Sequence, residues 1–170
     1  AHVAATAGFD VRLHDVAEER INGALATING NMARLVAKGA LSDDVRQQAL
    51  GRIKAAPALE GLADCDIVIE AATENEEVKR KIFAAVCTVV KPEAMLASNT
   101  SSISITRLAA STDRPERFIG IHFMNPVPLM QLVEIIRGIA TDDNTFDSAK
   151  TFVSKLGKTV TMSEDFPAFI

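Results

Sequence analysis

The chain has 170 residues, 48% of them apolar and 24% charged, and its formal net charge at pH 7 is −4. This composition predicts a compact domain with a substantial core, and the negative net charge argues against a basic nucleic-acid surface. The sequence contains no apolar run near the ~20 residues of a membrane span. Two cysteines, Cys65 and Cys87, form neither a disulfide framework nor a metal-ligand spacing, so we expect a cytoplasmic protein without a metal site.

The first third of the chain predicts a strand followed by a pair of helices. Residues 10–15 ("DVRLHD") read as a short strand that ends on an acid. Apolar residues at helical spacing predict a helix over 18–38 and a second helix that begins at Ser42 and reaches Ile53. We expect these helices to form an antiparallel hairpin inserted between two strands, an arm of about residues 17–54.

The rest of the chain alternates strands with helices. The apolar patterns predict strands at 65–72, 94–98, 117–124, 131–137 and 158–163, and helices at 76–90, within 99–110 and at 143–156. This alternation predicts a Rossmann-type doubly wound α/β fold, with a mostly parallel sheet and a helical-hairpin insertion. Such sheets bind ligands beyond the carboxyl ends of their strands.

Both ends of the sequence suggest a piece of a longer chain. "AHVAATAG" (1–8) reads as the second half of a helix that ends at Gly8, and "EDFPAFI" (164–170) stops on an apolar run. We therefore expect this domain to continue on both sides.

A histidine and a glutamate occur where the pattern predicts buried strands. His122 lies near the end of the apolar run 117–124, and Glu134 lies between Val133 and Ile135 in the next strand. Because burying an ionisable group is costly unless it is paired, we expect the two side chains to bond each other. The carboxylate would then fix the imidazole tautomer and support a general base. The alternative is a structural pair that satisfies two buried polar groups.

Asp15 ends the first predicted strand. In a dinucleotide-binding fold, an acid at this place bonds the adenine ribose about 20 residues after a glycine-rich fingerprint. Counting back puts that fingerprint before Ala1. An acid here also favours NAD over NADP, which carries a phosphate on the same ribose. The alternative is a solvated acid at a strand end.

Glu74 and Lys79 follow the predicted strand 65–72, in the loop and the first turn of the next helix. A cofactor at the carboxyl end of the sheet would pass this loop. The alternative is that Lys79 to Lys81 form a solvated helix face beyond a helix N-terminus that favours acids.

"SNTSSISIT" (98–106) places five short polar residues directly after a predicted strand. Ser101 or Ser102 could cap the following helix, but the excess over one cap leaves Asn99 and Ser101 free to bind a ligand. A hydrolase triad of Ser101 with His122 is a weak alternative, because the sequence has no nucleophile elbow G-x-S-x-G.

On the predicted hairpin, Asn31, Arg34 and Lys38 lie at helical spacing off the apolar stripe. A basic edge of this kind could hold a nucleotide phosphate, and the alternative is a solvated helix face.

Three segments together resemble the 3-hydroxyacyl-CoA dehydrogenase family, nearest its bacterial 3-hydroxybutyryl-CoA dehydrogenase branch. They are "DCDIVIEAATENEEVKRKIF", "SNTSSISIT" and "RFIGIHFMNPVPLMQLVEIIRG". The resemblance covers essentially the whole chain in order, and its most specific part is H-F-M-N-P-V with a glutamate twelve residues after the histidine.

The resemblance implies an NAD-dependent interconversion of an (S)-3-hydroxyacyl-CoA, in particular 3-hydroxybutyryl-CoA, with the 3-ketoacyl-CoA. His122 would be the general base and Glu134 would orient it. Ser101 and Asn125 would lie at the substrate oxygen and the nicotinamide. The other implied residues are Asp15, Glu74, Lys79 and Asn99 for the cofactor, and Lys38 and Asn31 for coenzyme A.

The resemblance also implies that parts of the enzyme lie outside this chain. These are the first strand with its glycine fingerprint, and a C-terminal helical domain that completes the substrate pocket and forms a homodimer. We therefore expect the piece alone to be a poor enzyme.

Other readings remain open. The chain could belong to a non-catalytic structural relative, as crystallin relatives of this family are thought to be. It could also be the dehydrogenase segment of a multifunctional β-oxidation protein, or another hydroxyacid dehydrogenase, which the helical arm disfavours.

Overall fold

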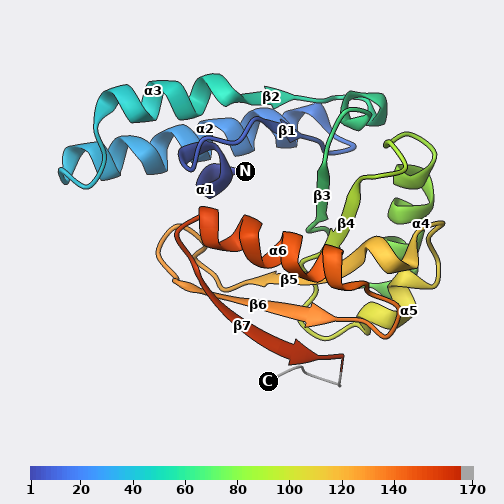
Figure 1. Ribbon diagram of the computed structural model, residues 1–170. Coiled ribbons are helices and arrows are strands. Elements are labelled where there is room, and N and C mark those ends of the chain that lie inside the picture. The colour runs from blue at the N-terminus through green and yellow to red at the C-terminus, as the bar shows by residue number, and fades with distance from the viewer. Residues whose placement is uncertain (166–170) are drawn as a thin grey trace. The chain divides into compact units, whose positions relative to one another are not determined.

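The computed structural model describes residues 1–165 and divides the chain into two compact units, residues 1–61 and 62–170, each of which is described by itself (Figure 1). None of the helices in the described residues is long and apolar enough to cross a membrane.

The first unit is a two-stranded parallel sheet packed with helices. Its elements are α1 (His2–Thr6), β1 (Val11–Leu13), α2 (Glu18–Ala37), α3 (Asp43–Arg52) and β2 (Ile53–Ala55). The two strands pair with Val11 opposite Ile53 and Leu13 opposite Ala55. The buried centre of the unit consists of Ala5, Met32, Ala49 and Ile53.

The predicted helical hairpin is present as α2 and α3, which lie side by side in Figure 1. Gly39 follows α2 at a φ of 69°, a conformation that only glycine adopts without strain, so the helix ends there. The hydroxyl oxygen of Ser42 accepts a hydrogen bond from the N–H of Val45 and caps α3, as predicted.

The prediction that the second helix reaches Ile53 is wrong. Helix α3 ends at Arg52, and Ile53 is the first residue of β2, a strand that the sequence analysis did not predict. Ile53, the apolar residue at the start of this short strand, also continues the helical spacing of the stripe before it. Only the pairing of β2 with the distant β1 identifies the strand.

The second unit is a five-stranded sheet with helices between its strands. Its strands are β3 (Ile67–Glu70), β4 (Met95–Ser98), β5 (Phe118–Phe123), β6 (Leu132–Arg137) and β7 (Thr159–Glu164), in that order across the sheet. The helical elements are η1 (Leu59–Leu62) at its border, α4 (Glu76–Cys87), α5 (Ile105–Ala109), η2 (Pro115–Arg117) and α6 (Asp143–Lys155).

All strand pairs of the second unit are parallel except one. Helices connect β3 to β4, β4 to β5 and β6 to β7, and each of these pairs is parallel. Strands β5 and β6 are joined by a short loop with a cis peptide bond between Asn125 and Pro126, and they pair antiparallel. The predicted mostly parallel α/β sheet is thus confirmed, and the antiparallel hairpin lies inside it.

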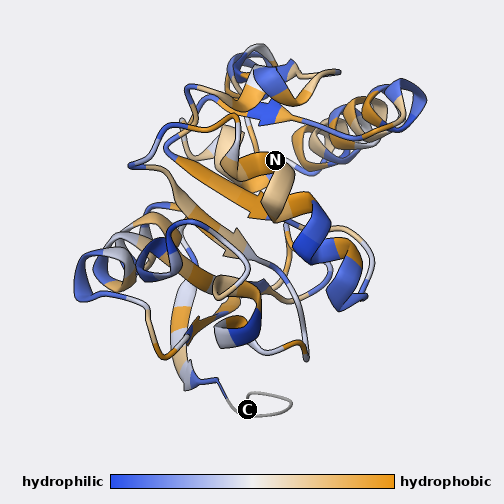
Figure 2. Ribbon diagram, turned by 90° about the vertical axis from the view of Figure 1, so that its right-hand side faces the viewer, coloured by the Kyte–Doolittle hydropathy of each residue, from blue (hydrophilic) through white to orange (hydrophobic). Residues whose placement is uncertain are grey.

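The core of the second unit lies on both sides of β5. Phe83 of α4 packs edge-on against Phe118, with ring centroids 4.7 Å apart. Ile119 and Ile121 alternate onto the opposite face and are fully buried. Helix α6 lies along β5, β6 and β7, and Figure 2 shows hydrophobic residues gathered on the central strands and hydrophilic ones on the outer turns of the helices.

Candidate active site

His122 and Glu134 are directly opposite each other in the antiparallel pair β5–β6. The Nδ1 atom of His122 lies 2.6 Å from Oε2 of Glu134, and the two side chains are 15% and 5% exposed. Because a carboxylate only accepts hydrogen bonds, Nδ1 carries a proton, and in the neutral imidazole Nε2 is left with its lone pair. The predicted bond between the two buried side chains is confirmed.

Ser101 faces the other nitrogen of the same imidazole. Its Oγ lies 3.0 Å from Nε2 of His122. With Nε2 unprotonated, the serine hydroxyl donates this hydrogen bond. A hydroxyl, an imidazole and a carboxylate therefore form one line, from the loop after β4 through β5 to β6, and its serine end is exposed.

Glu74 organises the loop that carries Ser101. Its Oε1 atom accepts hydrogen bonds from the hydroxyl of Thr100, from the backbone N–H groups of Ser101 (3.0 Å) and Ser102 (3.2 Å), and from the Ser102 hydroxyl (3.1 Å). Partial burial acts to raise the pKa of Glu74, but these hydrogen bonds and the charge of Lys79 outweigh it, so its pKa is lowered from the usual value. The carboxylate is thus held in its charged form.

Lys79 is buried, so the alternative of a solvated face at this position is wrong. Its side chain is 1% exposed, and Nζ lies 2.8 and 2.9 Å from the two carboxylate oxygens of Glu70 and 3.6 Å from Oε2 of Glu74. Lys79 lies on the inner side of α4 with Phe83 and Val86. Its role toward a cofactor stays a prediction.

The sequence analysis expected Asn99 to be free, but its side chain is bonded within the protein. Its side-chain oxygen accepts a hydrogen bond from the N–H of Phe123 at 2.8 Å, and its own N–H donates to the Glu70 carbonyl. It therefore ties the ends of β3, β4 and β5 together. Asn125 is exposed just beyond β5, three residues after His122.

The cap of helix α5 is Ser104, so the alternative that Ser101 or Ser102 caps it is wrong. The Ser104 hydroxyl oxygen accepts from the N–H of Arg107, and the Asp165 carboxylate accepts from the Ser104 hydroxyl at 2.7 Å. Ser101 is therefore available to His122.

The remaining predicted residues lie in the first unit. Asp15 follows β1, and its carboxylate accepts from the N–H of Ala17 at 3.0 Å and lies 3.8 Å from the Arg20 guanidinium. Asn31 accepts from Arg34 at 3.3 Å, and Lys38 is exposed at the end of α2. Their binding roles stay predictions.

The sequence analysis missed Glu70, Ser98 and Thr100, which are all buried. Glu70 closes the apolar run of β3, and a buried acid requires a partner, so this was a signal that could have been followed. Its partners are Lys79, the Ser98 hydroxyl at 2.7 Å and the N–H of Ala72 at 2.6 Å.

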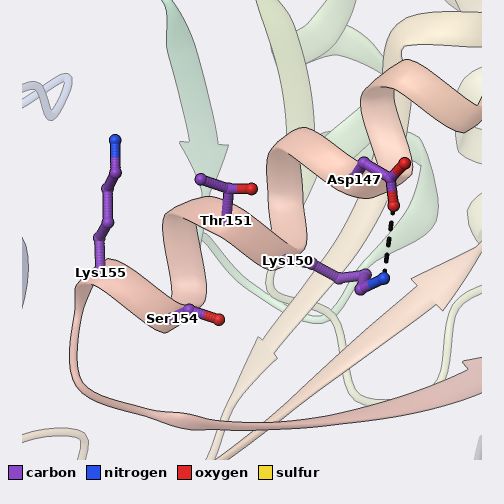
Figure 3. A pocket seen from close by; sticks show the side chains of 5 residues that line it. All are labelled: Asp147, Lys150, Thr151, Ser154 and Lys155. Atoms are coloured by element: carbon purple, nitrogen blue, oxygen red, sulfur yellow. Dashed lines mark hydrogen bonds and ion pairs between the residues drawn. The ribbon is translucent and has the colours of Figure 1, made fainter.

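A hollow on the surface of α6 offers no comparable arrangement. Figure 3 shows its five lining side chains, all from this helix, with an ion pair of 3.3 Å between Asp147 and Lys150. In the described part of the chain, no group of three or more acids, histidines or cysteines could hold a metal ion.

Comparison with known proteins gives consistent matches. The family model described as "3-hydroxyacyl-CoA dehydrogenase, NAD binding domain" matches residues 1–166. A 3-hydroxybutyryl-CoA dehydrogenase of Bradyrhizobium diazoefficiens is 68% identical over all 170 residues, which cover 58% of its length. A probable 3-hydroxybutyryl-CoA dehydrogenase of Deinococcus radiodurans is 48% identical over the whole chain, which covers 61% of its length.

Among solved structures, the (S)-3-hydroxybutyryl-CoA dehydrogenase of Ralstonia eutropha superposes with a TM-score of 0.97 at 41% identity. The match covers 99% of this chain and 60% of that protein. The chain thus spans about three fifths of the length of the relatives it matches.

Proposed function

Because the chain belongs to the 3-hydroxyacyl-CoA dehydrogenase family, as its NAD-binding domain, we propose that the protein containing it interconverts an (S)-3-hydroxyacyl-CoA and the 3-ketoacyl-CoA. The observation that carries this proposal is the hydrogen-bonded line from Ser101 through His122 to Glu134, with Nε2 directed at the serine hydroxyl. The names of the relatives support 3-hydroxybutyryl-CoA as the substrate.

The residues fit a dinucleotide cofactor. The parallel strands β3 and β4 end on polar loops that carry Glu74 and Ser101, and His122 lies in β5 near its carboxyl end. Open α/β sheets bind ligands at this edge. In the first unit, Asp15 follows β1, where an acid suits the hydroxyls of the adenine ribose. Bound NAD would supply the hydride acceptor.

His122 would take the proton of the substrate hydroxyl on Nε2 as the bond from carbon 3 to hydrogen breaks toward the cofactor. The imidazole then carries a positive charge, which the Glu134 carboxylate stabilises at Nδ1. The Ser101 hydroxyl would bond the substrate oxygen beside Nε2 and keep it in line. In the reverse direction, the imidazolium returns the proton to the oxygen of the ketone.

We extend the proposal to the other implied residues and partners. Asn125 would contact the substrate or the nicotinamide, Asn99 and Lys79 would border the cofactor, and Lys38 with Asn31 would contact coenzyme A. The complete protein would be a cytoplasmic homodimer, joined through a domain outside this chain. Cys65 and Cys87 form no disulfide within the described residues, which suits a reducing compartment.

The test is NADH oxidation by the full-length protein with acetoacetyl-CoA, beside a His122→Ala variant. We expect rapid turnover that falls by about 100-fold to 10,000-fold in the variant, since general acid–base catalysis contributes on that order. NADH affinity and thermal unfolding of the variant, measured in parallel, control for loss of fold.

A non-catalytic relative would give a different result. NADH binding without turnover in the wild-type protein, at any acyl-CoA chain length tried, would contradict the proposal, and His122 would then be a satisfied scaffold residue.

A further inference from the structure

We propose that Glu74, anchored by the buried pair Lys79–Glu70, is a positioning residue that fixes the Ser101 hydroxyl against Nε2 of His122. This inference rests on the proposed function, since it assigns Glu74 to the same proton-transfer site. It differs from the cofactor contact that the family resemblance implies for this residue.

The buried pair Lys79–Glu70 is a rigid anchor. The Glu70 carboxylate is 2% exposed and accepts hydrogen bonds from Lys79 Nζ at both oxygens, from the Ser98 hydroxyl and from the N–H of Ala72. A buried ion pair is stable only where its geometry is good and other hydrogen bonds satisfy the remaining lone pairs and protons of both groups. Lys79 is therefore held in one place, at the inner edge of α4.

The ammonium of Lys79 links this anchor to Glu74. Lys79 Nζ lies 3.6 Å from Oε2 of Glu74, so the ammonium faces one carboxylate oxygen. The other oxygen, Oε1, accepts all four hydrogen bonds from the loop after β4. One oxygen of Glu74 thus faces the buried charge while the other holds the loop.

The loop after β4 that Glu74 holds carries Ser101. Ser101 donates its backbone N–H to Glu74 and its hydroxyl to Nε2 of His122. Thr100, immediately before it, is fully buried and bonds the same Glu74 oxygen. A shift of the Glu74 carboxylate would therefore move the serine hydroxyl away from the imidazole.

A pure cofactor ligand and a positioning residue predict different kinetics. Loss of a cofactor contact weakens NADH binding, whatever residue stands at position 101. Loss of a positioning contact lowers kcat, and only while the Ser101 hydroxyl is present to be positioned.

The test is a double-mutant cycle in the full-length protein with Glu74→Gln, Ser101→Ala and both together. We expect Glu74→Gln to lower kcat for acetoacetyl-CoA roughly tenfold or more, as misplaced groups do, with the NADH Kd changed by less than about threefold. In the Ser101→Ala background, the same substitution should change kcat by less than about twofold. Thr100→Val, which removes one donor and no charge, should lower kcat in the same direction by less.

Two outcomes would overturn the inference. One is a tenfold or larger rise in the NADH Kd with kcat preserved, on the order expected for a lost ligand. The other is an equal loss of kcat from Glu74→Gln with and without Ser101.

A second readout keeps the inference separate from the proposed function. In protein labelled with ¹⁵N-histidine, the Nε2 resonance of His122 reports the Ser101 hydrogen bond whether or not the protein turns over. We expect Glu74→Gln to move this resonance toward its position in Ser101→Ala, and an unmoved resonance would contradict the inference. A wild-type protein that turns over no acyl-CoA would instead defeat the proposed function.

Discussion

The ammonium of Lys79 is the charge in the described residues that is most enclosed by protein, at 1% exposure of its side chain. Removing one partner of a buried ion pair leaves the other charge unpaired, and this costs far more than the pair itself contributes. We expect Lys79→Met to lower the free energy of unfolding by about 3–5 kcal/mol, measured by urea denaturation.

A matched control and a rescue test the reason for this loss. Lys81→Met removes a lysine two positions away whose ion pair with Glu77 is mostly exposed, and it should leave the urea midpoint unchanged. The double variant Lys79→Met with Glu70→Met leaves no buried charge, so it should recover most of the stability. A double variant as unstable as the single one would contradict this account.

The sequence allowed one half of this site to be predicted and hid the other. His122 and Glu134 could be assigned because both lie in apolar runs that predict buried strands, where each needs a partner. Lys79 was obscured by a run of charges, although its spacing to Phe83 and Val86 is that of one helix face. The four donors that converge on Glu74 depend on loop geometry, which no periodicity encodes.

At the scale of elements, Gly120 of β5 lies where neighbouring side chains leave no room for a Cβ. A Cβ added there would lie 2.8 Å from the Cβ of Ile136 and 2.9 Å from Cδ1 of Ile105. Helix α5 therefore approaches the sheet at the one position of β5 without a side chain. Because Ile136 is on the neighbouring strand and cannot withdraw, we expect Gly120→Ala to destabilise the protein by about 1–3 kcal/mol.

The control for Gly120→Ala is a glycine in an open position. A Cβ at Gly23, in the exposed part of α2, would meet nothing within 4 Å. Gly23→Ala should stabilise by about 0.5–1 kcal/mol, because alanine loses less conformational entropy in a helix. Thermal unfolding of both variants would measure the two signs, and stabilisation by Gly120→Ala would show that α5 can move away.

Most elements could be predicted because each carries its own apolar period and its own boundary residues, as Gly39 and Ser42 do for the hairpin. Strand β2 could not, since three residues are too few for a period and only the pairing of Ile53 with Val11 defines it. The cap of α5 was misplaced among several serines because its choice depends on Asp165, 60 residues away from Ile105.

For the whole molecule, several carboxyl groups bind protons less tightly in the folded state. Glu74, Glu76, Asp113, Asp142 and Asp165 all have a lowered pKa. Hydrogen bonds from the Arg114 guanidinium are the main cause at Asp113, whose pKa is lowered to about 2. As pH falls, these groups take up protons at a higher pH in the unfolded chain than in the folded protein. Their contribution to stability should therefore be complete above the ordinary carboxyl pKa and should be lost as pH drops from about 4 toward 2.

This pH dependence can be measured as the urea midpoint at pH 7, 4 and 3. In Asp113→Asn, the loss of stability between pH 4 and 3 should be smaller than in the wild-type protein, because one of the groups that take up protons on unfolding is gone. A midpoint that rises on acidification would contradict the assignment of these pKa directions.

The direct pairing of His122 with Glu134 has a consequence for protein engineering. Their contact is set by the register of two strands, and the eight residues 124–131 that join those strands help to fix this register. A connection of another length could let the ladder slip by one residue, and a slip of one residue turns a side chain to the opposite face of the sheet. Redesign of this rim for other substrates should therefore keep the length of the connection and Asn125, and vary its other residues, so that the proton-handling pair stays aligned.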